Sequence, residues 1–116
     1  MFVEGCIYDK ATEDDGARCL VMRLWPRGVA QSRIDVWLKE LGPLPAYLKD
    51  LDSRTIHWGQ FIERYVDQLR AHAASITALE QLHQLEAGVG KVTLLCHEKE
   101  YPCHRYILLD YLAGRM

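Results

Sequence analysis

The chain has 116 residues and a mass of 13.4 kDa, which is the size of one domain and too small for two independent cores. Hydrophobic residues make up 49% of it and charged residues 26%, a composition that excludes disorder, collagen-like repeats and disulfide-dense scaffolds. Fourteen basic and sixteen acidic side chains give a formal net charge of -2, so no global field attracts nucleic acid or an anionic membrane. We therefore expect a single domain over residues 1–116, and any bound anion must be held locally.

The sequence shows no targeting or membrane signal. Residues 1–6 lack a basic stretch followed by an apolar run, and no later segment approaches the roughly 18 apolar residues that a membrane span needs. We expect a cytoplasmic protein that does not bind membranes. In a reducing compartment the four cysteines are expected to be thiols: Cys6, Cys19, Cys96 and Cys103. No pattern indicates a cofactor or an oligomeric state.

The first part of the chain reads as two strands and a helix. Residues 2–8 and 19–25 are apolar runs, and the second lacks polar alternation, which is typical of a central strand. Pro26 must end that strand because it cannot donate a ladder hydrogen bond. The connection over residues 9–18 is short for a crossover, so a parallel arrangement and a hairpin both stay open. Ser32 can cap a following helix that stops at Gly42 and Pro43 and carries apolar residues at helical spacing: Ile34, Trp37, Leu38 and Leu41.

The second part predicts further helices around one more strand. Residues 44–52 look like a turn that leads into a short helix, and residues 58–70 alternate apolar and polar positions at helical spacing. Ser75 can cap another helix, which Gly88 and Gly90 end before the buried strand of residues 92–96. A last helix carries Ile107, Leu108, Tyr111 and Leu112. This order predicts an α/β fold with a small, mostly parallel sheet of about three to four strands covered by helices.

Chemistry-bearing side chains surround the start of the last predicted helix. Pro102 suits the first helical position, which leaves the amides of Cys103 and His104 among the unpaired donors at the helix start. The helix dipole there favours negative charge and lowers the pKa of a thiol below the roughly 8.5 of free cysteine. Open α/β sheets bind ligands at such strand ends, so we expect an anion pocket where residues 19–25 and 92–96 end on one edge of the sheet.

Arginines at the same edge indicate the kind of ligand. Arg23 and Arg27 leave the end of one predicted strand, Arg105 lies at the helix start, and guanidinium donors suit planar or tetrahedral oxyanions. The leading hypothesis is an enzyme or binding domain for an anionic small molecule, such as a nucleotide or another phosphorylated metabolite. In the enzyme version the nucleophile is Cys103 or, less favoured, Cys96. His104 or Glu98 then transfers the proton.

Other interpretations of the same residues stay open. Cys6 and Cys19 are read as core packing, and the arginines can equally pair with acidic residues on the surface. Zinc binding by Cys96, His97, Cys103 and His104 is disfavoured by the spacing, because neighbours in a strand point to opposite faces. A disulfide between Cys96 and Cys103 is a redox alternative. A nucleic-acid-associated module that uses the arginines on phosphate is disfavoured by the net charge.

Several blocks together resemble one known family. They are Leu24-Trp25-Pro26-Arg27-Gly28, Trp37-Leu38-Lys39-Glu40-Leu41, Phe61-Ile62-Glu63-Arg64-Tyr65, and Leu94-Leu95-Cys96-His97-Glu98 with Cys103-His104-Arg105. Over nearly the whole chain the sequence resembles the family called domain of unknown function 488, in particular its short YeaO-like branch. The resemblance implies a small α/β domain and carries no activity. Two features depart from the short branch: Met22 stands where relatives usually have Asp, and the cysteine pattern is similar to that of the longer branch.

Overall fold

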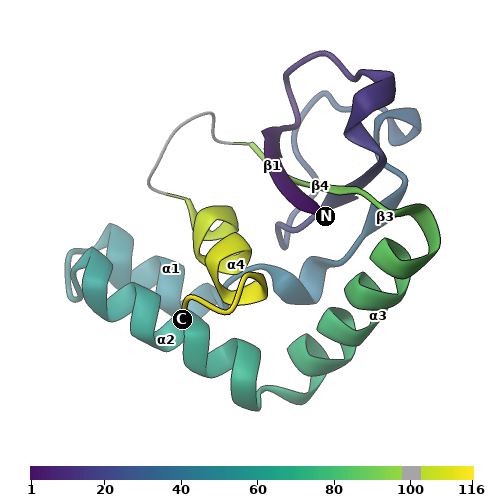
Figure 1. The fold of residues 1–116 in the computed structure, drawn as a ribbon. Coiled ribbons are helices and arrows are strands. Elements are labelled where there is room, and N and C mark those ends of the chain that lie inside the picture. Colours follow the sequence, from purple (N-terminus) through teal and green to yellow (C-terminus); the bar gives the residue numbers. More distant parts are fainter. Residues whose placement is uncertain (98–102) are drawn as a thin grey trace.

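A computed structural model of the chain describes residues 1–97 and 103–116 and contains one parallel sheet within them (Figure 1). Its strands are β1 (Phe2–Cys6), β2 (Ala17–Leu20), β3 (Val36–Trp37) and β4 (Val92–Cys96), in the spatial order β1-β4-β2-β3. β1 and β2 each pair in parallel with the central β4. The predicted α/β class is confirmed, and the hairpin alternative for the first two strands is wrong because β4 lies between them.

β1 and β2 both end before the apolar runs that predicted them. β2 stops at Leu20, and after Val21 the chain bends over residues 22–24 instead of continuing in the sheet. There the Arg23 Nε donates to the carbonyl oxygen of Pro43 at 2.9 Å, which draws the chain toward the segment before the next helix. β1 likewise ends at Cys6, where the Asp9 amide donates to the Cys6 carbonyl in a turn. Hydrophobicity alone does not show where an apolar run leaves a sheet.

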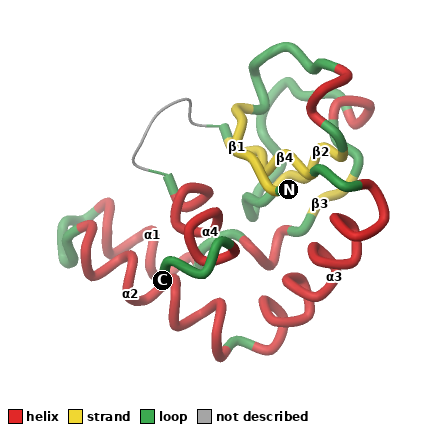
Figure 2. Tube along the Cα trace, viewed as in Figure 1, coloured by secondary structure: helices red, strands yellow, loops and turns green. Residues whose placement is uncertain are grey.

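The predicted helices of the second part are confirmed as α1 (Pro45–Asp52), α2 (Trp58–Ala71), α3 (Ala73–Val89) and α4 (His104–Leu112). Figure 2 shows them gathered on one side of the sheet. Their apolar faces meet side chains of β2 and β4 in the main core, which includes Phe61, Leu82, Leu108, Cys19 and Leu94. The helices cover one face only.

The other face of the sheet packs against loops. Leu20 and Leu95 point to this side, because successive residues of a strand alternate between faces. They form a smaller buried cluster with Ile7 and Val29, which come from the loops after β1 and β2. No helix in the described part of the chain has the length and apolar character needed to cross a membrane.

The helix predicted after Ser32 is wrong. The segment instead forms a 3-10 turn at Gln31–Arg33, the edge strand β3, and a second 3-10 turn at Lys39–Leu41. The Asp35 amide donates to the Arg18 carbonyl at 2.9 Å, and the Asp35 carboxylate accepts from the Arg18 amide at 2.7 Å. Pairing with the free edge of β2 therefore prevails over the helical spacing of the apolar residues.

Candidate functional site

The candidate site lies where β2 and β4 end, next to the start of α4. Because β2 and β4 are parallel neighbours, their carboxyl ends open on the same edge, which confirms the predicted shared edge. Cys96 is the last residue of β4, and Cys103 is the N-cap of α4 with extended backbone angles of φ -150° and ψ 146°. The helix thus begins at His104, later than expected, and Pro102 lies outside the described residues.

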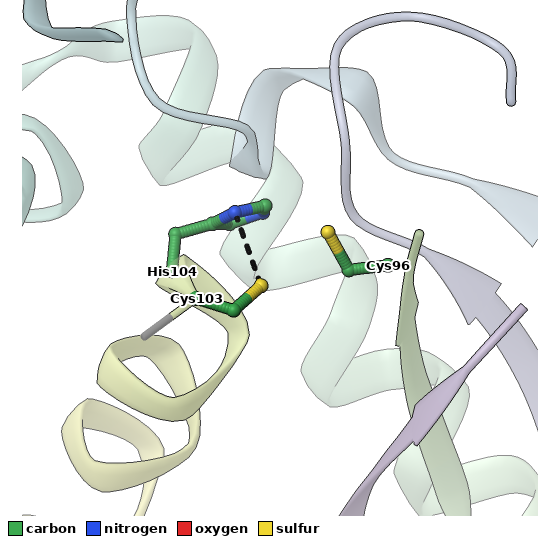
Figure 3. Close-up of side chains that lie close together, drawn as sticks. All are labelled: Cys96, Cys103 and His104. Atoms are coloured by element: carbon green, nitrogen blue, oxygen red, sulfur yellow. Dashed lines mark hydrogen bonds between the residues drawn. The ribbon is translucent and has the colours of Figure 1, made fainter. Parts of the chain in front are cut away.

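Two thiols and an imidazole meet at this edge. Cys96, Cys103 and His104 offer ligand atoms that all lie within 4.8 Å of one another (Figure 3). The Cys103 Sγ is 3.8 Å from the His104 Nδ1. All three residues are buried, with exposed fractions of 1%, 3% and 8% for Cys96, Cys103 and His104. The fold therefore encloses both thiols.

The orientation of the His104 ring is fixed from two sides. Its Nε2 lies 2.7 Å from the carbonyl oxygen of Val21, directly after β2, and a carbonyl oxygen only accepts hydrogen bonds. The ring of Tyr65 packs edge-on against it at 5.7 Å between centroids, while the Tyr65 hydroxyl donates to the Leu41 carbonyl. The proton of the neutral imidazole therefore sits on Nε2, and the Nδ1 lone pair faces the Cys103 sulfur.

Arg105 is a buried, positively charged neighbour of the Cys96–Cys103–His104 cluster. Its side chain is fully buried, and its Nε donates to the Glu4 carboxylate of β1 at 2.9 Å. One of its Nη atoms lies 3.6 Å from the Cys103 Sγ. Burial by itself lowers the pKa of the guanidinium, but the Glu4 hydrogen bond and the nearby Cys103 outweigh it and raise the pKa above its ordinary value. A permanent positive charge thus lies beside the Cys103 sulfur.

Burial keeps two groups of the protein core neutral, the hydroxyl of Tyr65 and the thiol of Cys19. It raises the pKa of Tyr65 well above its ordinary value, and the charges of Cys103 and Cys96 add to that shift. Burial also raises the pKa of the Cys19 thiol to about 12, even though a backbone hydrogen bond from Leu38 opposes it. Cys19 is therefore an inert core thiol, as predicted, and Tyr65 acts in its protonated form.

A pocket of about 170 Å³ opens at the cluster. Arg23 lines it, with its Nε bound to the Pro43 carbonyl and its Nη2 buried without a hydrogen-bond partner among the described residues. A larger hollow of about 780 Å³ shares Arg23, Leu24 and Leu48 with it. The inner pocket is lined by Met22, Arg23, Leu24, Pro43, Leu48, Cys96, His97 and His104.

The structure brings together only part of the predicted site. Cys96, His104 and Arg23 line the pocket, and Cys103 belongs to the cluster behind it. Arg27 is exposed on the loop after β2, where its carbonyl accepts from the Tyr8 hydroxyl, and it is not a lining residue. Arg105 faces Glu4 and Cys103 as described above. Glu98 lies outside the described residues.

Two residues that the sequence did not indicate contribute to the site. Glu4 and Tyr65 are both far from Cys96 and Cys103 in the sequence. The one signal for Glu4 is that it is a charged residue within a predicted apolar strand, and Tyr65 has no such signal. The alternation of side chains along a strand predicts that His97 points away from Cys96, but the His97 Nδ1 lies 3.8 Å from the Cys96 Sγ. The alternation of side chains does not apply there, because the strand ends at Cys96 and the chain bends at His97.

Comparison with known proteins supports one family assignment. The chain is 32% identical over 114 residues to the uncharacterized protein YeaO of Escherichia coli K12, covering 93% of each chain. It is 29% identical over 113 residues to the uncharacterized protein Rv3073c of Mycobacterium tuberculosis, covering 94% of this chain and 91% of the relative. No solved structure gives a significant match. Residues 5–116 match the family model DUF488-N3a, described as "Active DUF488-N3 subclade", so the chain belongs to the DUF488 family.

Proposed function

We propose that this protein is an enzyme that binds a small phosphorylated or nucleotide-like anion in the Arg23 pocket and acts on it with the Cys96–Cys103–His104 centre. The observation that carries the proposal is that Cys96, His104 and Arg23 line one pocket at the carboxyl edge of the parallel sheet. Ligand sites of open α/β sheets occur at this edge.

The Cys103–His104 pair supplies the reactive group. With its proton on Nε2, His104 presents a basic Nδ1 to the Cys103 thiol at 3.8 Å, the arrangement of a cysteine beside a general base. The buried Arg105 stabilises the resulting negative charge on sulfur. The product of this proton transfer is a thiolate, the form of cysteine that attacks electrophiles and that binds metals.

Arg23 is the anchor for the anion. Its Nη2 is buried without a partner in the described part of the chain, and a guanidinium forms its strongest hydrogen bonds with phosphate and carboxylate oxygens. The inner pocket of about 170 Å³ is small beside typical ligand sites of roughly 300–1,000 Å³. We therefore assign the inner pocket to the anionic group and the adjoining hollow along Leu24 and Leu48 to the rest of the molecule.

Binding of inorganic phosphate and nucleoside monophosphates, measured by titration calorimetry, tests the proposal. Arg23→Gln should weaken binding by about 10- to 100-fold, the worth of one charge-assisted hydrogen bond. Arg27→Gln is the matched control, because Arg27 is exposed and does not line the pocket, and it should bind like the wild type. Equal losses in both variants, or no saturable binding at all, would refute the anion site. Tighter, strongly salt-dependent binding to oligonucleotides would favour a nucleic-acid module instead.

A further inference from the structure

We propose that Cys96, Cys103 and His104 bind one zinc ion and leave its fourth coordination position open to the Arg23 pocket. The proposal deepens the function proposed above and rests on it in one respect: the ligand that meets the ion is the anion held by Arg23. Two thiolates and an imidazole form a ligand set that zinc prefers. Magnesium, by contrast, prefers oxygen ligands.

The distances fit a tetrahedral ion with little movement. Zinc–sulfur bonds of about 2.3 Å and zinc–nitrogen bonds of about 2.0 Å place neighbouring ligand atoms roughly 3.6–3.8 Å apart. The Cys103 Sγ and the His104 Nδ1 are already 3.8 Å apart. The Cys96 Sγ lies within 4.8 Å of the Cys103 Sγ and of a ring nitrogen of His104, so a shift of about 1 Å brings the two sulfurs to this spacing. Figure 3 shows the two sulfurs and the ring directed toward a common space.

The surroundings of His104 match those of a zinc ligand. A metal-bound imidazole almost always donates its other ring N–H to a carboxylate or a backbone carbonyl, which fixes the tautomer and the ring orientation. The Val21 carbonyl accepts this hydrogen bond at 2.7 Å, and the Tyr65 ring holds the imidazole from the side. Nδ1 is therefore prepared to bind the ion without rearrangement.

Charge balance also favours an ion in the cluster. Two thiolates carry a charge of -2, which zinc neutralises, while the nearby Arg105 is already paired with Glu4. The Arg105 guanidinium, which is already paired with Glu4, offsets at most part of two thiolate charges, and the low-dielectric interior penalises the remaining charge. The Arg105 Nη, 3.6 Å from the Cys103 Sγ, serves as a hydrogen-bond donor to a metal-bound sulfur.

The position of the pocket makes this a site with an exchangeable ligand. Structural zinc ions have four protein ligands, whereas catalytic ions have three and keep one position for water or substrate. Within residues 1–97 and 103–116 the cluster comprises three ligands, two of which line the pocket that contains Arg23. An anion bound by Arg23 thus reaches the ion through one of its oxygens.

Metal titration of the full chain tests the proposal. Protein freed of metal with a chelator is titrated with Zn²⁺ against a chromophoric competitor, and bound zinc is counted by elemental analysis. We expect one zinc per chain, and Cys96→Ser and Cys103→Ser should each weaken binding by at least about 100-fold, since each removes a direct ligand. Cys6→Ser is the matched control: Cys6 is a buried thiol at the end of the neighbouring β1, outside the cluster, and its loss should leave zinc affinity unchanged.

A second measurement uses the wild type, in case a serine variant fails to fold. Zinc should protect Cys96 and Cys103 from alkylation, read by peptide mapping, while labelling of Cys6 stays the same. Less than half an equivalent of zinc at micromolar concentrations, or protection that does not single out these two thiols, overturns the proposal.

Cobalt substitution separates this proposal from the proposed function. Phosphate should change the visible spectrum of the Co²⁺ form, and Arg23→Gln should abolish that change while leaving metal binding intact. A Co²⁺ spectrum that no anion alters indicates a closed structural site and overturns the open position. Phosphate binding through Arg23 without any metal binding refutes the zinc site and leaves the proposed anion site standing, whereas metal binding without phosphate binding refutes the anion site alone.

Discussion

Glu4 provides the sharpest test of how the buried site is held together. It comes from β1, and its carboxylate accepts a hydrogen bond from the Arg105 Nε at 2.9 Å. Arg105 is fully buried, whereas 35% of the Glu4 side chain is exposed. Glu4→Gln keeps an acceptor oxygen of the same shape and removes only the negative charge. Glu4→Ala removes the acceptor as well.

The expected cost follows from this asymmetric burial. A hydrogen bond to a charged partner contributes roughly 1.5–3 kcal/mol and a neutral one about 1 kcal/mol, so Glu4→Gln should lower the free energy of unfolding by about 0.5–2 kcal/mol. Leaving a buried charge without its partner costs about 3–5 kcal/mol. Water can reach the exposed side of Glu4, so we expect about 2–4 kcal/mol for Glu4→Ala, below the upper end of that range.

Urea unfolding at pH 7 measures these losses, with Asp110→Asn as the control. Asp110 pairs with Arg115 at 3.3 Å on the surface, where both side chains are largely exposed, and its substitution should change stability by less than about 0.5 kcal/mol. Glu4→Gln should also speed the alkylation of Cys103, because Glu4 then no longer offsets the positive charge of Arg105 that stabilises the thiolate. If Glu4→Gln costs no more than Asp110→Asn, the pair does not support the site.

Three further predictions follow from the same contacts. In metal-free protein, Cys103 should be alkylated at least about 10-fold faster than Cys19, whose pKa burial raises to about 12; time-resolved labelling with peptide mapping checks the order. Burial raises the pKa of the Asp15 carboxyl, but hydrogen bonds from the Thr12 backbone and the Arg18 side chain outweigh it and lower the pKa overall. Asp15→Asn should therefore cost stability at pH 7, and its difference from the wild type should shrink as the pH falls below about 4, as urea unfolding at several pH values will show. Gln68→Met should lower the unfolding free energy by about 1–3 kcal/mol, because it leaves two backbone groups of the segment beside Arg23 without partners; equal stability would contradict that role.

Elements with strong periodicity were predictable from the sequence. The bounds of β4 agree with the apolar run of residues 92–96, and α2 agrees with the helical spacing that starts at Trp58. The order of elements was enough to predict a parallel α/β sheet, and the resemblance to the DUF488 family was confirmed.

Elements set by tertiary pairing were not predictable. Residues 36–37 form an edge strand although their neighbours are spaced like a helix, because the backbone of β2 offers free hydrogen-bonding groups on that side. Nothing local to Val36 or Trp37 signals this pairing. The end of β2 is set in the same way by a distant contact, the hydrogen bond from Arg23 to Pro43.

The candidate site was likewise predictable only in part. The sequence predicted that Cys96, Cys103 and His104 lie near one edge of the sheet, because local patterns indicate where a strand ends and where a helix begins. The sequence did not predict that the three side chains would be in contact, because that contact depends on how α4 packs against the sheet. Contacts from outside the motif set this position: Tyr65 of α2 packs against the His104 ring, and Glu4 of β1 pairs with Arg105.

The difference between a nucleophile and a metal ligand depends on this packing. A nucleophilic thiol beside an arginine, as predicted for Cys103, must be accessible to attack a diffusing substrate. The fold instead buries Cys103 and Cys96 to 3% and 1% exposure and places the His104 Nδ1 3.8 Å from the Cys103 sulfur. Cys96 and His104 line the pocket, whereas Cys103 is not among its lining residues. The ion that we propose for these three groups would meet an anion held by Arg23 at its open coordination position, without direct contact between that anion and Cys103.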